Sequence, residues 1–479
     1  MTNPVLVFHR VSPFRYDLTG VRTGSVRDQL MRSSLLAHGL IDDKIIARDR
    51  PLLILGAGAA GMNAAMTAAN LGVPVTVLEL RPQPFAALQQ ASWRRVDPTE
   101  YDWPQPHWRH GSFPIAPGTI PLMQQQGTGT ALVATWMTAW QDWLTYLNGR
   151  GHRGRIDLHL SCDAWHFVAG MKDTAGGVTV PGPWPDGSAH KSFCAVLSCI
   201  GFGREQTADN RLPQGWSGYS GPAFWTDDDG ISSGAKLPPR VSSVVISGGG
   251  DGALQDVQRV LTMGYFGREL FEKIQTEAHA VNPRLDIAPP SLCAVILAAE
   301  DEGRRAYAWH GPAQPPVKAM KKWHETIADA VAVLMKGWAT TDKAALAKRV
   351  LRPEMFTTGL QVTWLTREPH PSYAYALNRF LVLVLAGLAD TDAKAGKRFL
   401  RRYGYEIDSI VPSSPTHVCT SAANCQGIDH QVVLNPVGGA GSTITVTANM
   451  IVIRHGTEPK PMLGGAPVRE QMTPFDLPQ

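Results

Sequence analysis

The chain has 479 residues, of which 44% are hydrophobic and 18% charged, and its length allows about three globular domains. The net charge of +4, with scattered basic residues, argues against a nucleic-acid partner, and the longest apolar run, 380–389, is too short for a membrane span. The start lacks a signal-peptide pattern, and the six cysteines include no C-x-x-C pair or zinc spacing, so we expect a reduced, cytoplasmic protein without a metal site. Residues 1–50 are predicted to be a packing extension with an amphipathic segment at 25–38.

A glycine-rich turn between two short strands is the strongest functional signal. An apolar strand at 52–55 leads into the pattern G-x-G-x-x-G, followed by a helix of small residues at 59–71 and a strand at 75–78. The three glycines are Gly56, Gly58 and Gly61. In this order they suit a tight turn, a close approach of the backbone to a diphosphate, and close packing of the helix on the strand. Glu79 directly follows the second strand, where it can accept ribose hydroxyls, so the segment predicts a dinucleotide-binding unit.

A loop-rich segment at 80–126 carries the densest polar and aromatic cluster, at 94–95 and 101–110. It follows the first unit at the sheet edge where open α/β sheets bind ligands. Trp103 and Trp108 are suited to stack on a flat ring. The cluster also supplies candidate catalytic groups that can steady an anion or move protons, namely Arg94, Asp102 and His107. The alternative is a rigid, proline-rich loop that covers the core.

A helix and several strands are predicted downstream of this loop. The helix covers about 130–147, and the strands lie at 156–162, 178–180 and 193–200. The last strand ends in a glycine segment that includes Gly201. Such a strand can return to the first sheet and bring this glycine to the cofactor.

A second glycine turn follows an apolar strand at 243–246 and precedes a helix at 254–261. Its residues are Gly248, Gly249, Gly250, Asp251, Gly252 and Ala253. They form G-x-G-x-x-A, and alanine in the third place is common where the ligand is NADP. The context of strand, turn and helix predicts a second nucleotide-binding turn.

The second unit then departs from the expected order. A strand carrying an acid or arginine for the ribose should follow within about 20 residues, but 264–280 has the pattern of loop and helix, and 281–400 appears mostly helical. Sheet-like sequence resumes in four stretches that we interpret as the closing strands of the second unit: 405–411, 431–434, 442–446 and 450–453.

Two further clusters are weaker candidates. The first comprises His417, Cys419, Cys425 and His430. Its spacing suits neither a metal site nor a redox site, and we favour a structural loop. The second comprises Arg367–His370, Tyr373 and Tyr375. It is either a lid contact or the entry to a helix, and we favour the helix entry.

The order of motifs resembles that of flavoproteins with two dinucleotide-binding domains, which bind FAD at an N-terminal glycine turn and NAD(P)H at a second one. The resemblance covers roughly residues 50–265 and 400–460. It implies an α/β fold with two Rossmann-like domains and a mostly helical insertion in the second. The implied parts are an N-terminal extension, an FAD-binding domain, a second NAD(P)-binding-like domain in two pieces and the insertion: 1–50, 51–240, 241–264 with 401–479, and 265–400.

Three features differ from the relatives that the motifs resemble, the thioredoxin reductases and the flavin-containing monooxygenases. There is no redox cysteine pair, so disulfide reduction is not expected. The segment 219–225 lacks the histidine of the monooxygenase signature. The second turn has Gly252 where thioredoxin reductases usually have serine, and the strand that should follow this turn is absent or displaced.

The resemblance implies an FAD-dependent oxidoreductase, as a reductase or NAD(P)H-reduced monooxygenase acting on a small organic substrate. Two alternatives stay open, namely an oxidase or dehydrogenase with a vestigial second site, and a non-catalytic nucleotide-binding sensor or assembly module that uses 281–400 as its surface. A homo-oligomer also stays open. The implied cofactors are FAD and NADPH or NADH. The residues expected to bind them are Gly56, Gly58, Ala59, Ala60, Gly61, Glu79, Arg81, Gly201, Gly248, Gly250, Asp251 and Ala253.

Overall fold

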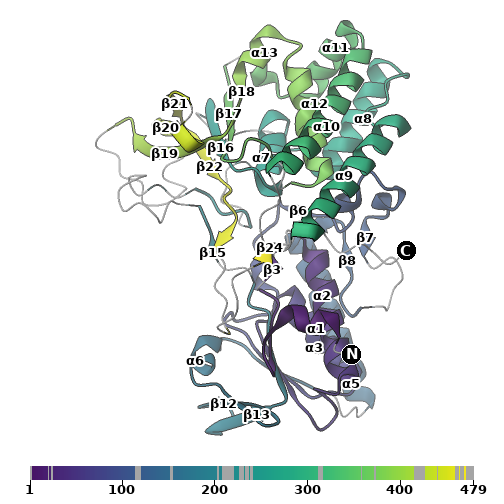
Figure 1. Cartoon of the computed structure of the whole chain (residues 1–479), viewed down its shortest axis with the longest axis vertical. Helices are drawn as coiled ribbons and strands as arrows, with labels where there is room; N and C mark the ends of the chain where they lie inside the picture. Colours follow the sequence, from purple (N-terminus) through teal and green to yellow (C-terminus); the bar gives the residue numbers. More distant parts are fainter. Residues whose placement is uncertain are drawn as a thin grey trace. The chain divides into compact units, whose positions relative to one another are not determined.

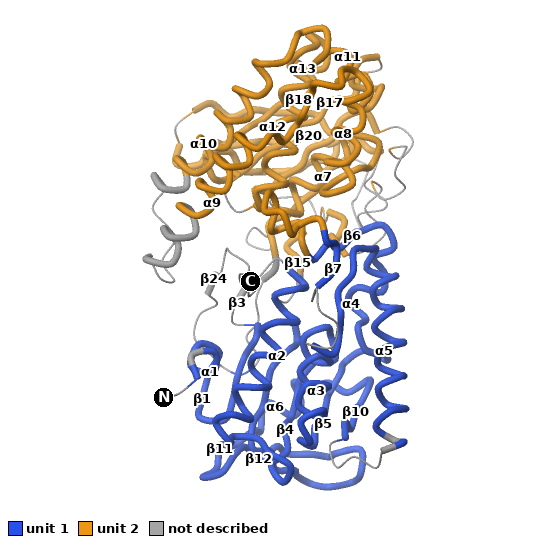
Figure 2. Tube along the Cα trace, turned by 90° about the vertical axis from the view of Figure 1, so that its right-hand side faces the viewer, with its two compact units in different colours: residues 1–98, 110–204, 457–479 blue, residues 99–109, 205–456 orange. Residues whose placement is uncertain are grey.

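The computed structural model divides the chain into two compact units, each with its own parallel sheet. Unit 1, blue in Figure 2, comprises residues 1–98, 110–204 and 457–479, and unit 2, orange, comprises residues 99–109 and 205–456. The structure describes residues 3–19, 21–22, 25–113, 120–150, 155–201, 204–207, 219, 221–225, 231, 237, 241–310, 317–357, 359–371, 374–414, 427–439, 441–458, 463 and 469–470.

Unit 1 is built on a six-stranded sheet (Figure 1). Its strands are, in order across the sheet, β1 (Arg10–Ser12), β2 (Arg15–Asp17), β14 (Ala195–Ser198), β4 (Leu52–Leu55), β5 (Val75–Leu78) and β10 (Ile156–His159). The strands from β2 to β10 run parallel, and β1 pairs antiparallel with β2. Every residue of β4, β5 and β14 is buried, as expected for inner strands of a parallel sheet. The predicted strands at 52–55 and 75–78 and the return of 193–200 to the first sheet are confirmed.

Residues from the first fifty positions form part of this unit's core. They supply α1 (Pro4–His9), two of the sheet strands and α2 (Val26–Asp42), which packs on α3 (Ala59–Asn70). The buried Asn63 of α3 fastens the pair, because its Nδ2 donates to the carbonyl oxygen of Leu30 at 2.9 Å and to Ser33 Oγ at 3.0 Å. The predicted packing extension is therefore a structural part of the first sheet and its helical cover.

A small antiparallel sheet covers one end of the first sheet. It contains β11 (Lys172–Thr174), β12 (Gly177–Pro181) and β13 (His190–Phe193). With α6 (Ala164–Val168) it encloses an apolar cluster around Phe167 and Trp184, which also contacts β4 and β14. The remaining elements of unit 1 are β3 (Val21–Arg22), α4 (Ala86–Gln89), β6 (Arg95–Val96), β7 (Ser112–Phe113), β8 (Gln124–Gln125), β9 (Gly127–Thr128), α5 (Gly129–Arg150) and β24 (Arg469–Glu470).

Unit 2 has a four-stranded, all-parallel sheet and a separate antiparallel one. The parallel sheet contains, in order, β18 (Phe399–Tyr403), β17 (Gln361–Thr366), β16 (Ser243–Ser247) and β22 (Met450–Ile453). The antiparallel sheet contains β19 (Tyr405–Pro412), β20 (His430–Pro436) and β21 (Ile444–Ala448). All four late stretches form strands of unit 2, as predicted, but only 450–453 joins the parallel sheet, and the other three make up the antiparallel one.

The antiparallel sheet packs on one face of the parallel sheet of unit 2, and the helices of the unit lie on the other side (Figure 1). They are α7 (Asp251–Leu261), α8 (Gly267–Val281), α9 (Pro290–His310), α10 (Val317–Gly337), α11 (Thr340–Val350), α12 (Ala376–Ala389) and α13 (Ala393–Arg398). The apolar run at 380–389 lies in α12, which is buried along most of its length. Every helix in the described part of the chain is too short or too polar to span a lipid bilayer. The predicted helical insertion is confirmed in character, except that it also contains β17.

The units differ from the domains expected from the sequence in where the chain passes between them. Two short strands, β15 (Arg204–Glu205) and β23 (Thr457–Glu458), mark two of these passages. Residues 99–109, with the 3₁₀ turns Glu100–Asp102 and Pro106–His110, belong to unit 2 although they lie between segments of unit 1. Each unit has a parallel sheet in which one strand, β4 or β16, leads into a glycine turn and a helix. This arrangement confirms the predicted α/β class.

Candidate functional site

The first glycine turn (Gly56–Gly61) joins β4 to α3, and two of its glycines leave no room for a side chain. Gly56 has φ +96°, and a Cβ there would lie 2.6 Å from the carbonyl oxygen of Cys199. A Cβ at Gly61 would lie 1.9 Å from the carbonyl oxygen of Gly56. Glycine is required at both positions, because the helix and the neighbouring strand pack directly against the turn.

Gly58 differs from these two, because the space beside it is open. No described atom lies within 4 Å of a Cβ built there, and its φ of −71° suits any residue. Gly58 is the N-cap of α3 and no side chain caps this helix, so the N–H groups at Ala59 and Ala60 begin an uncapped helix. Open space beside the positive end of a helix is what a bound diphosphate requires.

Glu79 lies where the sequence predicts it, directly after β5. Its Oε2 accepts a hydrogen bond from the N–H of Ala57 at 2.6 Å, and its Oε1 accepts one from the N–H of Arg81 at 2.8 Å. Arg81 thus contributes to the site through its backbone. Each carboxylate oxygen has a further lone pair, so Glu79 can brace the turn and still accept a ribose hydroxyl.

The segment after β14 forms the wall beside the first turn. The N–H of Cys199 donates to the carbonyl oxygen of Leu55 at 2.7 Å, and Gly201 follows with φ +83°. Burial raises the pKa of the Cys199 thiol, which keeps it protonated and unreactive. The predicted position of Gly201 near the first turn is consistent with this geometry, while its contact with a cofactor stays a prediction.

The second glycine turn (Gly248–Ala253) joins β16 to α7 and repeats the geometry of the first. Gly248 has φ +146°, and a Cβ there would lie 2.4 Å from the carbonyl oxygen of Arg454. Gly250 is the N-cap of α7, without a capping side chain and with no described atom within 4 Å of a Cβ built there. Ala253 is fully buried under the turn. Unit 2 therefore holds a second uncapped helix start that faces open space.

The strand that sequence reasoning found absent or displaced is β17, which is displaced. It pairs in parallel with β16 and is followed by Glu368. Oε2 of Glu368 lies 3.5 Å from a Cβ built at Gly249, so this carboxylate reaches the second turn. The sequence placed Glu368 in a weaker cluster and did not reveal it as the acid of the second turn, because the helices α8 to α11 separate its strand from the turn. The signal was present in Gln-Val-Thr-Trp-Leu-Thr, a run rich in β-branched and aromatic residues that precedes Arg-Glu.

Asp251, the first residue of α7, is bonded to another helix. Its Oδ1 accepts hydrogen bonds from the N–H of Tyr375 at 2.9 Å and from Nδ2 of Asn378 at 2.8 Å, both at the start of α12. Burial raises the pKa of Asp251 to about 7, and these two hydrogen bonds oppose the rise. Oδ1 of this carboxylate therefore holds α12, and a contact of Asp251 with a cofactor stays a prediction.

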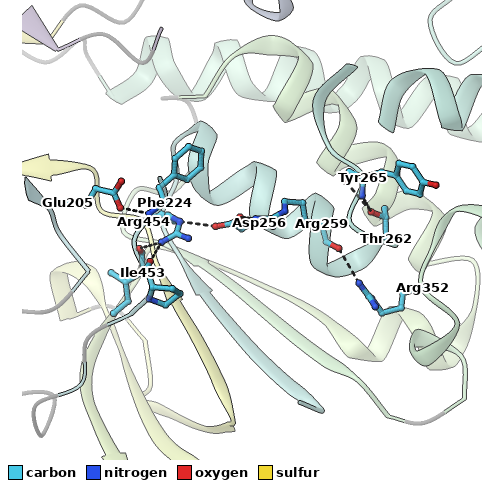
Figure 3. A network of polar contacts seen from close by, with 10 residues as sticks. Glu205, Phe224, Asp256, Arg259, Thr262, Tyr265, Arg352, Ile453 and Arg454 are labelled. Atoms are coloured by element: carbon cyan, nitrogen blue, oxygen red, sulfur yellow. Dashed lines mark hydrogen bonds and ion pairs between the residues drawn. The ribbon is translucent and has the colours of Figure 1, made fainter. Parts of the chain in front are cut away.

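Arg454, the residue after β22, connects α7 to neighbouring segments of unit 2, as Figure 3 shows. Its Nε donates to Asp256 Oδ2 at 2.8 Å, and its Nη1 donates to the carbonyl oxygen of Pro222 at 2.5 Å. Asp256 also pairs with Arg259 at 3.0 Å. The side chains of Asp256, Arg259 and Arg454 are all almost fully buried. This network fixes residues 222–224 against the start of α7.

The position of Phe224 explains why the second turn has glycine where the reductases it resembles usually have serine. A Cβ at Gly252 would lie 3.1 Å from Cε2 of Phe224. Tyr219, in the same segment, is buried and donates to the carbonyl oxygen of Ile451. The described part of 219–225 is therefore a structural wall of unit 2.

The aromatic cluster at 99–109 also has a structural role. The Trp103 ring packs on Phe380 at a centroid distance of 4.7 Å, and the Trp108 ring packs on Phe271 at 5.1 Å. Arg268 lies over the Trp108 ring at 4.4 Å. The two tryptophans are core residues, so the prediction that they stack on a flat ligand is not supported by their positions.

The three candidate catalytic residues fall in different units. Asp102 and His107 lie in unit 2 and approach each other to 3.4 Å between Oδ2 and Nε2, with the histidine partly exposed. Arg94 lies in unit 1 and is fully buried. Within unit 2 the aspartate and the histidine lie together, and the catalytic role of all three residues stays a prediction.

The structure describes only one histidine of the first weaker cluster but most of the second. Residues 417, 419 and 425 of the first lie outside the described residues, while Nδ1 of His430 is 2.8 Å from the carbonyl oxygen of Ile428. In the second cluster, His370 stacks on His324 at 5.1 Å, and burial lowers the pKa of both imidazoles. Tyr375 is the N-cap of α12, which supports the favoured helix entry, and Tyr373 lies outside the described residues. No group of three or more His, Cys, Asp or Glu side chains among the described residues could hold a metal ion.

Comparison with known proteins gives distant likenesses. A family model described as alanine dehydrogenase/PNT, C-terminal domain, matches residues 37–111, which include the first glycine turn. No protein with a curated description matches the sequence. Among solved structures, the chain is similar to thioredoxin reductase from Lactococcus lactis, with 12% identity, a TM-score of 0.35, and coverage of 85% of this chain and 77% of that chain.

Two further structures show the same degree of similarity. Thioredoxin reductase from T. acidophilum has 12% identity and a TM-score of 0.36, with coverage of 85% of this chain and 77% of that chain. Bacillithiol disulfide reductase from Staphylococcus aureus has 9% identity and a TM-score of 0.37, with coverage of 85% and 76%. At these values the activity of the chain has to be judged on its own residues.

Proposed function

We propose that the protein is an FAD-dependent oxidoreductase that binds FAD at the first glycine turn and a nicotinamide dinucleotide at the second, and acts on a small organic substrate. The observation that carries the proposal is the repetition of one site within the chain. In each turn, a backbone carbonyl oxygen lies where the first glycine would carry a Cβ. Each turn also has an uncapped helix start beside open space, and a glutamate just beyond the adjacent strand. Two dinucleotide sites in one chain fit electron transfer between two cofactors.

At the first site, the backbone does most of the binding. The N–H groups at Ala59 and Ala60 would hold the diphosphate of FAD, with Gly58 leaving the space for it. Glu79 would accept the ribose hydroxyls while it keeps its bond to the turn. When bound, a reduced nicotinamide supplies hydride, and a flavin accepts it and passes electrons to substrate or dioxygen.

At the second site, Glu368 favours NADH over NADPH. A carboxylate accepts hydrogen bonds from both ribose hydroxyls, whereas it repels a 2′-phosphate. The neighbouring Arg367 does not reverse this preference, because its Nε faces Glu406 at 3.5 Å and its side chain is 61% exposed. The proposal therefore names NADH as the reductant.

The cysteines that the structure describes favour an organic substrate over a disulfide. Cys162, Cys194, Cys199 and Cys293 are free thiols in the structure. Burial raises the pKa of three of them, namely Cys162, Cys199 and Cys293. A redox pair would instead need an exposed thiol with a lowered pKa. The paired Asp102 and His107 are our candidates for proton transfer to the substrate.

An absorbance spectrum of the purified protein is the first test, with flavin bands expected near the blue and near-ultraviolet. The second is anaerobic stopped-flow mixing of the flavin-loaded protein with NADH and, separately, NADPH. We expect rapid bleaching by NADH and slower bleaching by NADPH. A protein that stays colourless after incubation with FAD would overturn the proposal.

The same measurements separate the two alternatives. Bleaching by an organic substrate, with no response to either nicotinamide, would identify an oxidase or dehydrogenase whose second site is vestigial. The second turn argues against this, since Gly248, like Gly56, has a positive φ and a backbone carbonyl oxygen where a Cβ would lie. A protein that binds nucleotide and never changes redox state would be a sensor or assembly module.

A further inference from the structure

The carboxylate of Asp251 connects the second glycine turn to the helices of unit 2. It belongs to the first residue of α7, directly after the uncapped Gly250. Both of its hydrogen bonds, from Tyr375 N–H and Asn378 Nδ2, end on Oδ1. Oδ2 accepts none from the described residues, and Asp251 is half-buried. One carboxylate oxygen therefore holds α12, and the other is left at the turn.

The partner amide is itself held in one orientation. Nε2 of Gln258, two turns along α7, donates to Oδ1 of Asn378 at 3.0 Å. Oε1 of Gln258 in turn accepts the N–H of Gly267 at 2.8 Å. Because its oxygen is engaged by a donor, the Asn378 amide presents its Nδ2 to Asp251 and cannot flip without losing both bonds.

The charges around Asp251 act in opposite directions. Arg379 on α12 favours its ionised form, and Glu300 on α9 opposes it. These two residues are paired with each other, so the cation is shared. Beside the turn, Glu368 adds a further negative charge, and the guanidinium of Arg454 is committed to Asp256. Among the described residues, Asp251 therefore has no cation of its own to offset an additional anion.

We propose that binding of a nicotinamide dinucleotide at the second glycine turn takes up one proton from solvent, and that Asp251 is the group that receives it. This rests on the proposed function of the second turn. A bound diphosphate brings two negative charges next to a half-buried carboxylate, where Coulomb repulsion is only weakly screened. Protonation removes that repulsion, and the new O–H at Oδ2 can donate to a phosphate oxygen while Oδ1 keeps its bonds to α12.

The balance is protein plus dinucleotide plus one proton, giving the protonated complex. Burial raises the pKa of Asp251 to about 7 in the free protein, and the diphosphate raises it further. Just above neutral pH the free carboxylate is mostly ionised and the bound one mostly protonated. Linkage then makes the affinity fall as pH rises through this range, by up to tenfold per pH unit.

The test is titration calorimetry of the FAD-loaded protein with ADP-ribose, which carries the adenosine and diphosphate but donates no hydride. At pH 7.5 to 8.5, titrations in phosphate and in Tris separate the heat of proton uptake, because these buffers differ in ionisation enthalpy. We expect the wild type to take up between half a proton and one proton per ADP-ribose bound. The affinity of the wild type, measured across the same range, should weaken with rising pH.

Asp251→Asn is the discriminating variant, because an amide oxygen can still accept the two bonds from α12 but does not titrate. We expect it to bind ADP-ribose with no proton uptake and a flat pH dependence. Asp408→Asn, at an exposed acid of β19, is the matched control and should behave as wild type.

Each outcome bears on the proposal. Uptake that is unchanged in Asp251→Asn, or binding by the wild type without uptake, overturns it. If Asp251→Asn does not fold, the buffer dependence and pH slope of the wild type decide instead. An absence of binding heat for ADP-ribose in every buffer would be a different result, because it removes the second nucleotide site and with it this coupling.

Discussion

The two units of the molecule share one topology and differ in how the chain builds it. In unit 1 the four parallel strands β10, β5, β4 and β14 repeat the arrangement of β18, β17, β16 and β22 in unit 2. In both, a three-stranded antiparallel sheet precedes the last strand in the sequence. In both, a glycine with positive φ follows that strand by three residues, at Gly201 and Gly456. The topology of the sheet therefore identifies a nucleotide-binding unit more reliably than the spacing of its parts in the sequence.

The units also differ in what supports each turn. The first turn is supported locally, by Glu79 and by the backbone at Cys199. The second is tied through Asp251 to α12 and through Arg454 to residues 222–224. A change of charge or position at the second turn can therefore affect α12, whereas the contacts that support the first turn come from strands of its own sheet and the residues that follow them.

The largest effect we expect comes from exchanging the third residue of the two turns. Gly61→Ala would place a Cβ 1.9 Å from a carbonyl oxygen, so we expect the free energy of unfolding to fall by at least ~3 kcal/mol, with loss of FAD binding. Ala253→Gly should lower the free energy of unfolding by only ~1 kcal/mol, the helix-propensity difference. Urea denaturation measures both. Equal effects would mean that the two turns do not differ in packing.

The next effect separates binding from folding at the open glycines. Gly58→Val and Gly250→Val add side chains where no described atom lies within 4 Å. We expect each substitution to weaken binding of the cofactor at its own turn about 100-fold, ~2.7 kcal/mol, and to leave the melting temperature unchanged. FAD retention reports the first variant, and NADH titration the second.

Two other open glycines serve as matched controls for these variants. Gly176→Val in unit 1 and Gly337→Val in unit 2 fill space of the same kind away from the turns. Loss of FAD in Gly250→Val, or of NADH binding in Gly58→Val with FAD retained, would contradict the assignment of one cofactor to each turn.

A smaller effect concerns the pH dependence of stability. Because the pKa of Asp251 is raised from 3.8 to about 7 in the folded protein, its contribution is favourable below about pH 4 and is lost as pH rises toward 7. Relative to Asp251→Asn, the wild type should lose about 2 kcal/mol of unfolding free energy over this range, since the carboxylate keeps part of its contact with water. Urea melts at pH 4.5 and 7.5 give the difference, and parallel curves for the two proteins would refute it.

The smallest effect compares the two glutamates. Glu368→Gln should weaken NADH binding by about tenfold, ~1.4 kcal/mol, and narrow the preference for NADH over NADPH. Glu79→Gln should in addition lower the melting temperature, because Glu79 accepts the N–H of Ala57 within the turn. Titration of each variant with both nicotinamides, alongside a thermal melt, distinguishes these outcomes. A preference that is unaltered in Glu368→Gln would remove this residue from the ribose site.

The first turn could be predicted from the sequence because all of its parts are local. The strand, glycines, helix and Glu79 lie within one short segment, and their physical requirements are fixed by backbone geometry. β17 could not be found in the same way, because the rule that places the second strand near the turn fails when helices intervene. The late strands were predicted to belong to the second unit, but their division between a parallel and an antiparallel sheet was not, since a short apolar run does not reveal whether its partner is parallel.

The tryptophans at 103 and 108 show a second limit of sequence reasoning. A loop rich in tryptophan, histidine and arginine after a nucleotide-binding unit has the composition of a ligand site. The residues that pack on it, Phe271 and Phe380, come from α8 and α12. Nothing near the loop in the sequence announces these partners. Only the tertiary structure distinguishes an aromatic core from an aromatic pocket.

The placement of 99–109 within unit 2 has a consequence for synthesis of the protein. This segment leaves the ribosome before α8 and α12 exist, so its tryptophans remain without their packing partners while the nascent chain lengthens. Unit 1 is likewise unfinished until residues beyond 457 have emerged. Neither unit is a continuous stretch of chain, so a single truncation isolates neither, and a fragment that stops before Phe380 should expose Trp103 and bind chaperones or aggregate.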